Sequence, residues 1–177
     1  MQKKELILDS TDINHIIARV CHTILEVHKN PDNLALIGIR TGGEYLAQRI
    51  FNQIKVIENI ELSLGNIDIT LYRDDWTKIG YQPILQGTEI NFAIDKKKII
   101  LVDDVLFTGR TVRAAMDAIF DIGRPDQIEL AVLVDRGHRE LPIRADYCGK
   151  KIETKHEQMI NVYLKEHDGR DAVMIEG

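Results

Sequence analysis

One segment constrains the fold of this chain more than any other. Residues 99–111 read Ile-Ile-Leu-Val-Asp-Asp-Val-Leu-Phe-Thr-Gly-Arg-Thr. The first four are a continuous apolar run, which is typical of a strand covered on both faces of a parallel sheet. Two carboxylates follow, then a short turn with hydroxyl groups and a glycine. The segment therefore predicts a strand, a polar turn and a helix, with a ligand at the carboxyl end of the strand.

The same order of strand, loop and helix recurs along the chain. An apolar run over 34–39 precedes Gly42-Gly43 and a helical pattern from 44 to about 54. The helix after the turn should run from about Arg110 to Asp121, and 130–134 is the next apolar run. Repeated units of this kind predict an α/β protein with a doubly wound, mainly parallel sheet.

The remaining elements are less strongly marked. Helical spacing predicts a first helix, capped by Ser10 or Thr11 and stopped by Asn30-Pro31. Alternation of apolar and polar residues over 67–72 predicts a strand. The apolar stretches 160–164 and 172–175 flank a turn sequence and predict a hairpin. No repeat or linker divides the chain, so we expect a single domain over residues 1–177.

Composition narrows the class of protein. The chain has 177 residues, of which 44% are hydrophobic, and no apolar run is long enough to cross a bilayer. The beginning of the sequence does not resemble a signal peptide. Cys21 and Cys148 are far apart and form no CxxC pair, which favours reduced thiols over a disulfide in a cytoplasmic protein. A net charge of −5 argues against indiscriminate nucleic-acid binding, although a local basic patch is compatible with it.

The chemistry of residues 103–111 suits a phosphorylated ribose. A helix N-terminus offers unpaired amides and the positive end of a dipole, which together bind phosphate. Thr108 and Thr111 add hydroxyl donors, and Gly109 lets the backbone approach closely. Carboxylates at Asp103 and Asp104 can accept from ribose hydroxyls. Strand alternation would aim these two at opposite faces, so we expect the chain to turn there.

Three different kinds of segment share part of this pattern. An apolar strand that ends in Asp-Asp also resembles a Walker B metal site, but the GxxxxGK[ST] partner is absent. Phospho-acceptor domains have acidic strand ends without a need for the Thr-Gly-x-Thr turn. A purely structural turn would not need adjacent carboxylates. The ribose-binding hypothesis is the one that accounts for the carboxylates and the turn together.

Residues 102–111 resemble the phosphoribosyl-pyrophosphate signature of type I phosphoribosyltransferases. The resemblance extends over most of the chain to one family, the bifunctional pyrimidine-operon attenuators and uracil phosphoribosyltransferases (the PyrR family). It rests on the matching segments Ile37–Gly43, Asp68–Asp75 and Leu133–Tyr147. It implies the type I phosphoribosyltransferase fold with a small hood from about 135 to 175, and a homodimer or higher homo-oligomer.

The resemblance also implies site residues. Arg40 and Arg73 would stabilise the departing pyrophosphate, Asp103 and Asp104 would serve the ribose and, indirectly, Mg²⁺, and these four are the expected catalytic residues. Substrate contacts are expected from Thr41, Gly42, Val105, Leu106, Phe107, Thr108, Gly109, Arg110, Thr111, Arg136, Gly137 and His138. The segment from Tyr72 to about Asp95 would be a mobile loop that closes over the site. Many members carry arginine where this chain has Gly42, which removes one cation from the pyrophosphate loop.

Residue-level alternatives remain for three of these sites. Gly42-Gly43 could simply start a helix, the run after Tyr72 could be a solvated strand end, and His138 taken alone could be surface structure. RNA contacts are implied at Arg19, His22, Arg144 and Lys150. Four solvated surface charges would give the same pattern.

The expected reaction joins uracil to phosphoribosyl pyrophosphate and gives UMP and pyrophosphate, with Mg²⁺ as cofactor. The second expected role is regulation of a pyrimidine operon through UMP-dependent binding of leader RNA. The alternatives are a nucleotide-sensing RNA-binding regulator with little catalysis, an enzyme without RNA binding, and a phosphoribosyltransferase for another base.

Overall fold

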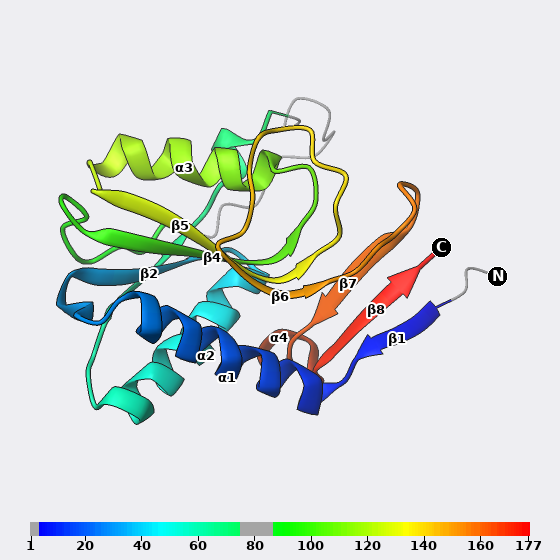
Figure 1. The fold of residues 1–177 in the computed structure, drawn as a ribbon. Helices are drawn as coiled ribbons and strands as arrows, with labels where there is room; N and C mark the ends of the chain where they lie inside the picture. Colours follow the sequence, from blue (N-terminus) through cyan, green and yellow to red (C-terminus); the bar gives the residue numbers. More distant parts are fainter. Residues whose placement is uncertain (1–3, 75–86) are drawn as a thin grey trace.

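A parallel sheet forms the centre of the molecule. The computed structural model describes residues 4–74 and 87–177, and its main sheet has the strand order β3-β2-β4-β5-β6 (Figure 1). All neighbouring strands in it are parallel, which confirms the predicted doubly wound sheet. The strands are β2 (Leu34–Ile39), β3 (Ser63–Ile67), β4 (Lys98–Leu106), β5 (Gln127–Asp135) and β6 (Tyr147–Lys151).

Helices cover both faces of this sheet. α1 (Ser10–Val27) and α2 (Gly42–Glu58) lie on one face, and α3 (Arg110–Ile122) lies on the other (Figure 1). Ala114, Ala115 and Ala118 are buried on α3, so this helix packs closely on the sheet, as their small size predicts. The two apolar layers bury β2, β4 and β5 almost completely, which explains why these strands are continuous apolar runs.

A second, smaller sheet lies beyond the carboxyl ends of the parallel strands (Figure 1). It is antiparallel, with the order β1-β8-β7, and consists of β1 (Lys4–Leu8), β8 (Ala172–Glu176) and β7 (Met159–Tyr163). The predicted hairpin of β7 and β8 is confirmed, with the short helix α4 (Lys165–Asp168) in its connection. The hood range expected from 135 to 175 also contains β6, which belongs to the main sheet.

The predicted cap of α1 is wrong. Asp9, not Ser10 or Thr11, is the N-cap residue. Its carboxylate accepts from the Asp12 amide at 3.0 Å, and the Asp12 carboxylate accepts from the Asp9 amide at 3.1 Å. This reciprocal pair satisfies two amides at once, which a hydroxyl at the next position would not do.

The strand predicted over 67–72 is also wrong. β3 ends at Ile67, and Thr70–Tyr72 form a turn of 3₁₀ helix. The carboxylate of Asp68 accepts from the Thr70 amide at 2.9 Å and so bends the chain directly after the strand. β3 itself contains Gly65 and Asn66, two residues of low strand propensity, and its pairing with β2 is what makes it a strand.

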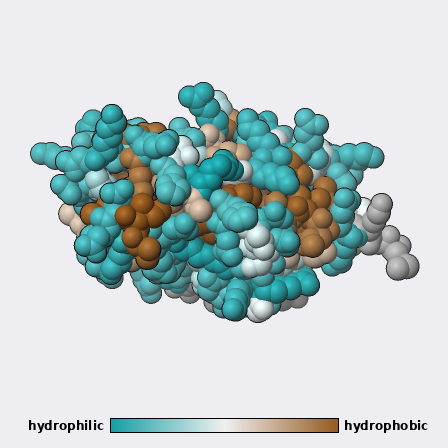
Figure 2. All heavy atoms as spheres, turned by 60° about the horizontal axis from the view of Figure 1, so that its bottom comes forward, coloured by the Kyte–Doolittle hydropathy of each residue, from teal (hydrophilic) through white to brown (hydrophobic). Residues whose placement is uncertain are grey.

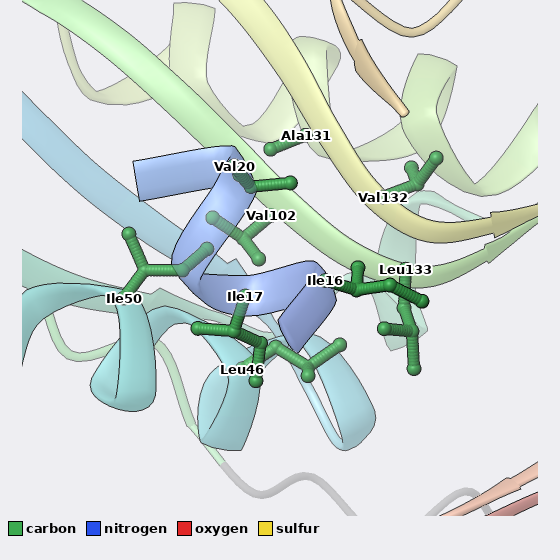
Figure 3. A pocket seen from close by; sticks show the side chains of 9 residues that line it. All are labelled: Ile16, Ile17, Val20, Leu46, Ile50, Val102, Ala131, Val132 and Leu133. Carbon is green, nitrogen blue, oxygen red and sulfur yellow. The ribbon is translucent and has the colours of Figure 1, made fainter. Parts of the chain in front are cut away.

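The core beneath α1 and α2 contains a small void. A cavity of about 20 Å³ lies between these helices and the sheet, and Figure 3 shows apolar side chains around it. Its lining residues are Ile16, Ile17, Val20, Leu46, Ile50, Val102, Ala131, Val132 and Leu133. No side chain in this lining carries a polar group, so the cavity is a packing defect rather than a site for chemistry.

The outer surface of these two helices is mixed. Val27, Val56 and Ile57 are exposed on them. Figure 2 shows apolar surface on this side in separate areas with hydrophilic side chains between them. None of the helices within residues 4–74 and 87–177 is both long and apolar enough to cross a membrane.

Candidate functional site

The site begins where β4 extends beyond its neighbour β2. The pairing of β2 with β4 ends at Gly38 and Val102, whereas β4 stays paired with β5 as far as Leu106. The turn predicted at Asp103 and Asp104 is therefore wrong, because both residues lie inside the strand. They reach a common hollow nevertheless, since the end of β2 leaves this edge of β4 open.

The N-terminus of α2 packs against that open edge. A Cβ atom on Gly42 would lie 2.3 Å from Oδ2 of Asp104, and one on Gly43 would lie 2.2 Å from the carbonyl oxygen of Val102. Close approach of the β4 backbone thus requires glycine at Gly43, whereas at Gly42 the nearest atoms belong to the Asp104 side chain. α2 does begin at Gly42. The loop before it contains a cis peptide bond between Arg40 and Thr41.

These elements enclose a hollow of about 350 Å³, here called the carboxylate hollow. Strand ends of β2 and β4, the loop before α2 and the turn after β3 all contribute to it. Its lining residues are Ile39, Arg40, Thr41, Gly42, Asp68, Ile69, Thr70, Arg73, Asp103, Asp104, Val105 and Thr111. The structure thus gathers all four predicted catalytic residues around one space.

The two carboxylates are strongly perturbed. Asp103 accepts from the Asp104 amide at 2.9 Å, and Asp104 accepts from the Val105 amide at 2.7 Å. Burial raises the pKa of both carboxyl groups, and for Asp103 the neighbouring carboxylate of Asp104 raises it further. Two adjacent carboxylates with little water around them retain a proton more readily, and an arriving cation or ribose hydroxyls would favour their ionised form.

Arg40 is held by two carboxylates for which no role was predicted. Its guanidinium lies 2.9 Å from Glu89 and 3.5 Å from Glu44. Glu89 follows the segment 75–86, and a bridge between Glu89 and Asn66 fixes it beside β3. The orientation of Arg40 therefore depends on a residue distant in the sequence.

A second hollow, of about 630 Å³, adjoins the first and is here called the phosphate hollow. Its lining residues are Arg73, Asp74, Phe107, Thr108, Arg110, Thr111 and Glu140. Arg73 and Thr111 line both hollows, so the two lie side by side. Gly109 has a φ of +93° and lies in the left-handed region just before α3 begins at Arg110.

Side chains at the end of β4 and the start of α3 have different surroundings. Arg110 forms ion pairs with Asp74 and Glu140, so its guanidinium bridges two loops. Leu106 is 1% exposed and belongs to the core, so of this residue only the backbone lies near the site. Its carbonyl accepts from the Arg136 amide at 3.0 Å and thereby joins the end of β4 to the loop after β5.

The loop after β5 is tied to the connection between β6 and β7. The guanidinium of Arg136 is buried, lies 4.0 Å from the ring centre of Phe107, and donates to Thr154 Oγ1 at 3.2 Å. His138 has a φ of +58°, and its Nε2 lies 2.7 Å from the Thr154 carbonyl. The ring of His156 completes a cluster with Phe107 and His138, with centroids 5.4 to 6.0 Å apart.

Arg139 braces this loop from beneath. It contacts both carboxylate oxygens of Asp135 at 2.6 Å and donates to the carbonyls of Phe107 at 2.6 Å and Ile143 at 2.9 Å. Burial alone would raise the pKa of Asp135. The hydrogen bonds that its carboxylate accepts from Arg139 and from the Gly137 amide hold this pKa below its usual value. The sequence predicted no role for Arg139, Thr154 or His156. Thr154 and His156 lie in a loop without any motif, and only the tertiary fold brings them here.

The predicted RNA-contacting residues lie near one edge of the sheet. Arg19 donates to the carbonyl of Gly149, the residue before Lys150 on β6. Arg144 lines a hollow of about 540 Å³ together with Thr23 of α1. Arg19, His22, Arg144 and Lys150 are all exposed. Within the described ranges none of Arg19, Arg144 and Lys150 forms an ion pair.

Part of the expected mobile loop lies outside the described residues. The segment was predicted from Tyr72 to about Asp95, and residues 75–86 are not described. At its start, the Tyr72 hydroxyl donates to Asp121 of α3 at 2.8 Å. Among residues 4–74 and 87–177, no cluster of three or more His, Cys, Asp or Glu side chains is arranged to hold a metal ion.

The sequence of the chain is similar to that of known proteins over nearly its full length. The family model described as "Phosphoribosyl transferase domain" matches residues 7–167. Curated relatives named "Bifunctional protein PyrR" include one from Desulfosudis oleivorans, 53% identical over 99% of this chain and 97% of its own length. Another, from Bacillus cereus, is 55% identical over 99% of this chain and 98% of its own length.

Solved structures share the fold at low sequence identity. A hypoxanthine phosphoribosyltransferase from Staphylococcus aureus has a TM-score of 0.72 at 20% identity, over 96% of this chain and 90% of that one. A hypoxanthine phosphoribosyltransferase from Trypanosoma cruzi has a TM-score of 0.74 at 18% identity, over 97% and 90%.

Proposed function

Since the chain belongs to the phosphoribosyltransferase family and, within it, to the family of bifunctional PyrR proteins, we propose that it transfers ribose 5-phosphate from phosphoribosyl pyrophosphate to uracil. The products are UMP and pyrophosphate. Its fold is that of the type I phosphoribosyltransferases. The proposed reaction specifies the base and the residues that act on it, which family membership alone does not do.

The observation that carries the proposal is that the phosphate and carboxylate hollows lie side by side, with Arg73 and Thr111 in the lining of both. A helix N-terminus with Thr108 and Thr111 lies at one end, and two buried carboxylates lie at the other. A 5′-phosphate on the amides of α3 would place the ribose hydroxyls toward Asp103 and Asp104. The pyrophosphate at the anomeric carbon would then face Arg40 and the loop before α2.

Charge placement fits the bond that breaks. In the reaction, uracil N1 attacks the anomeric carbon with inversion as the bond to pyrophosphate breaks, and the N1 proton is released to solvent. Positive charge develops on the ribose in the transition state. Asp104 would stabilise that charge, and Arg40 and Arg73 would stabilise the departing pyrophosphate. Removing one preorganised electrostatic contact of this kind costs about 3 kcal/mol in the transition state. No covalent nucleophile is required.

The donor set fits a magnesium ion carried by the substrate. Within the described ranges, the two carboxylates have no third acidic or histidine side chain with which to complete a metal site. Mg²⁺ is characteristically bound by one or two carboxylates together with substrate oxygens and water. Asp103 and Asp104 would hold the ion through ribose hydroxyls or water. The ion supplies charge neutralisation at the pyrophosphate.

The loop 136–138 provides the base end of the site. Its backbone is fixed by Arg136, by the Asp135–Arg139 pair and by two left-handed residues, Gly137 and His138. A rigid loop next to Phe107 can match the carbonyls and the N–H of uracil at low entropic cost.

The test is the formation of UMP by the purified protein. Radiolabelled uracil, phosphoribosyl pyrophosphate and Mg²⁺ are incubated with the protein, and UMP and pyrophosphate are quantified in equal amounts. A chelator should abolish formation of both products. Absence of UMP with a protein that binds phosphoribosyl pyrophosphate would overturn the uracil assignment.

A second function, regulation through RNA, is favoured by the basic surface at the α1 and β6 edge. Arg144 and Lys150 are exposed there, and Arg19 reaches the β6 backbone. Exposed cations without an ion pair in the described part of the chain can contact phosphates. UMP should tighten binding of leader RNA, and Arg19→Gln should weaken it without loss of uracil turnover. A chain that binds no leader RNA with or without UMP would be an enzyme alone.

A further inference from the structure

The two glutamates that hold Arg40 differ in how firmly they are themselves held. Glu44 lies in the first turn of α2, and its side chain is 25% exposed. One of its carboxylate oxygens lies 3.5 Å from Nε of Arg40, and the other accepts from Nδ2 of Asn66 at 3.1 Å. Glu44 therefore has a second partner, on β3, that keeps its carboxylate in place.

The carboxylate of Glu89 depends on Arg40 alone. The backbone of Glu89 is fixed, because its amide donates to the Asn66 carbonyl at 2.8 Å and its carbonyl accepts from the Asn66 amide at 2.9 Å. Its side chain is 64% exposed, and its carboxylate lies 2.9 Å from Nη2 of Arg40. In the described part of the chain, this carboxylate forms no other ion pair or hydrogen bond. It can leave Arg40 and enter water at little cost, since exposed ion pairs contribute little to stability.

The carboxylate hollow has little positive charge to offer an anion. Its described lining contains more carboxyl groups than guanidinium groups. The carboxyl groups belong to Asp68, Asp103 and Asp104, and the guanidinium groups belong to Arg40 and Arg73. Two further carboxylates lie beside Arg40, on Glu44 and Glu89. The attraction between Arg40 and a phosphate group is therefore reduced for as long as Glu89 is paired with it.

We infer that Glu89 competes with pyrophosphate for Arg40 and is displaced when pyrophosphate binds, whereas Glu44 stays in place. Glu89 acts through Arg40 and takes no part in the chemical step. The competition lowers the affinity of the protein for pyrophosphate and so favours release of this product. The inference rests on the proposed function for the location of pyrophosphate, and it adds a residue that sets how tightly pyrophosphate is held.

Equilibrium binding of pyrophosphate in the presence of Mg²⁺ tests the competition. Calorimetry compares the wild-type chain with Glu89→Gln, in which the side chain keeps its size and loses its charge. Glu89→Gln should bind pyrophosphate about two- to fivefold more tightly, the range that an exposed ion pair gives. UMP has no pyrophosphate group, so its affinity should be the same in both proteins.

Glu61→Gln is the matched control. Glu61 also belongs to an exposed ion pair, with Lys55 at 3.1 Å, and its side chain is 67% exposed. It precedes β3, whereas the site lies at the other end of this strand. Glu61→Gln should bind pyrophosphate and UMP as the wild type does. Similar melting temperatures would show that the variants fold.

A double-mutant cycle shows whether Glu89 acts through Arg40. Arg40→Met should weaken the binding of pyrophosphate. In the Arg40→Met background, Glu89→Gln should no longer tighten it. A general structural effect of Glu89→Gln would not depend on the residue at position 40.

The inference is overturned if Glu89→Gln binds pyrophosphate no more tightly than the wild type, if the gain persists in the Arg40→Met background, or if Glu61→Gln shows the same gain. The proposed function fails separately. A chain with the expected cycle for pyrophosphate that converts no uracil would contradict the enzyme assignment alone. Formation of UMP by a chain whose affinity for pyrophosphate does not change in Glu89→Gln would contradict the inference alone.

Discussion

Replacing the two glycines at the start of α2 should affect two different properties. Gly43→Ala should lower the stability of the protein, and Gly42→Ala should lower its activity. In Gly43→Ala, the new Cβ atom would lie 2.2 Å from the Val102 carbonyl, where ordinary contact begins at 3.4 Å. The obstructing atom belongs to the backbone of β4, so helix and strand must move apart by about 1 Å. Overpacking of this kind costs about 1–3 kcal/mol.

Whether Gly43→Ala lowers or raises the stability of the protein tests the close packing of α2 on β4. Without a clash, alanine in a helix would stabilise the protein by roughly 0.5–1 kcal/mol relative to glycine. We expect a net loss of about 1–2 kcal/mol for Gly43→Ala, and so a melting temperature lower by about 5 °C at this chain length. Thermal unfolding followed by circular dichroism measures it.

Gly42→Ala should instead act on the carboxylate. Its Cβ atom would lie 2.3 Å from Oδ2 of Asp104, and this side chain can rotate away. Rotation gives up the hydrogen bond from the Val105 amide at 2.7 Å and moves the charge from the ribose. We expect a melting temperature within about 2 °C of the wild type and a kcat/KM for uracil lower by at least about tenfold.

Gln48→Ala, exposed on the same helix, serves as the control for both variants. A more stable Gly43→Ala protein would refute the close packing of α2 on β4. Full activity of Gly42→Ala would refute the contact between the loop and Asp104.

Three further predictions follow from buried groups. Asp104→Asn should keep the circular dichroism spectrum and lower kcat/KM for uracil at least about a hundredfold, because one transition-state contact is lost. An unchanged rate in a folded variant would contradict the role of Asp104 in stabilising the transition state. Burial raises the pKa of Asp103 in the folded protein, so the wild type loses stability as pH rises through that pKa. Asp103→Asn should therefore melt above the wild type at pH 7, with the difference gone below about pH 4, the ordinary carboxyl range; a constant difference in thermal scans across that range would refute the charge argument. Val20→Ile should fill the apolar cavity and raise the free energy of unfolding in urea by up to about 0.8 kcal/mol; a loss would show that the cavity cannot admit a methylene group.

The strand and helix around residues 99–111 could be predicted because local pattern determines them. The apolar run, the glycine and the small residues of α3 all indicate the same structure, and α3 has nearly the expected bounds. β4 begins next to the predicted strand but continues to Leu106, past the predicted turn. The arrangement of Asp103 and Asp104 could not be predicted in detail. It depends on where β2 ends beside β4, which is a property of two strands far apart in the sequence.

The base end of the site shows the same limit. Arg136 and His138 follow a buried strand within a family segment, so their neighbourhood was expected. Their partners Thr154 and His156 lie on a connection with no motif, and only the packing of that connection on the loop brings them together. β3 was missed for a related reason, since Gly65 and Asn66 form a strand only through pairing with β2.

The choice of base is the most direct test of the account. Solved structures with this fold include hypoxanthine phosphoribosyltransferases, so the fold alone does not select a pyrimidine. The measurement is kcat/KM of the purified wild-type chain for uracil and for hypoxanthine, with saturating phosphoribosyl pyrophosphate and Mg²⁺. We expect UMP as the main product and a ratio in favour of uracil of at least about a hundredfold, the range that lost polar contacts in a base site produce. Equal turnover of the two bases, or a preference for hypoxanthine, would contradict it.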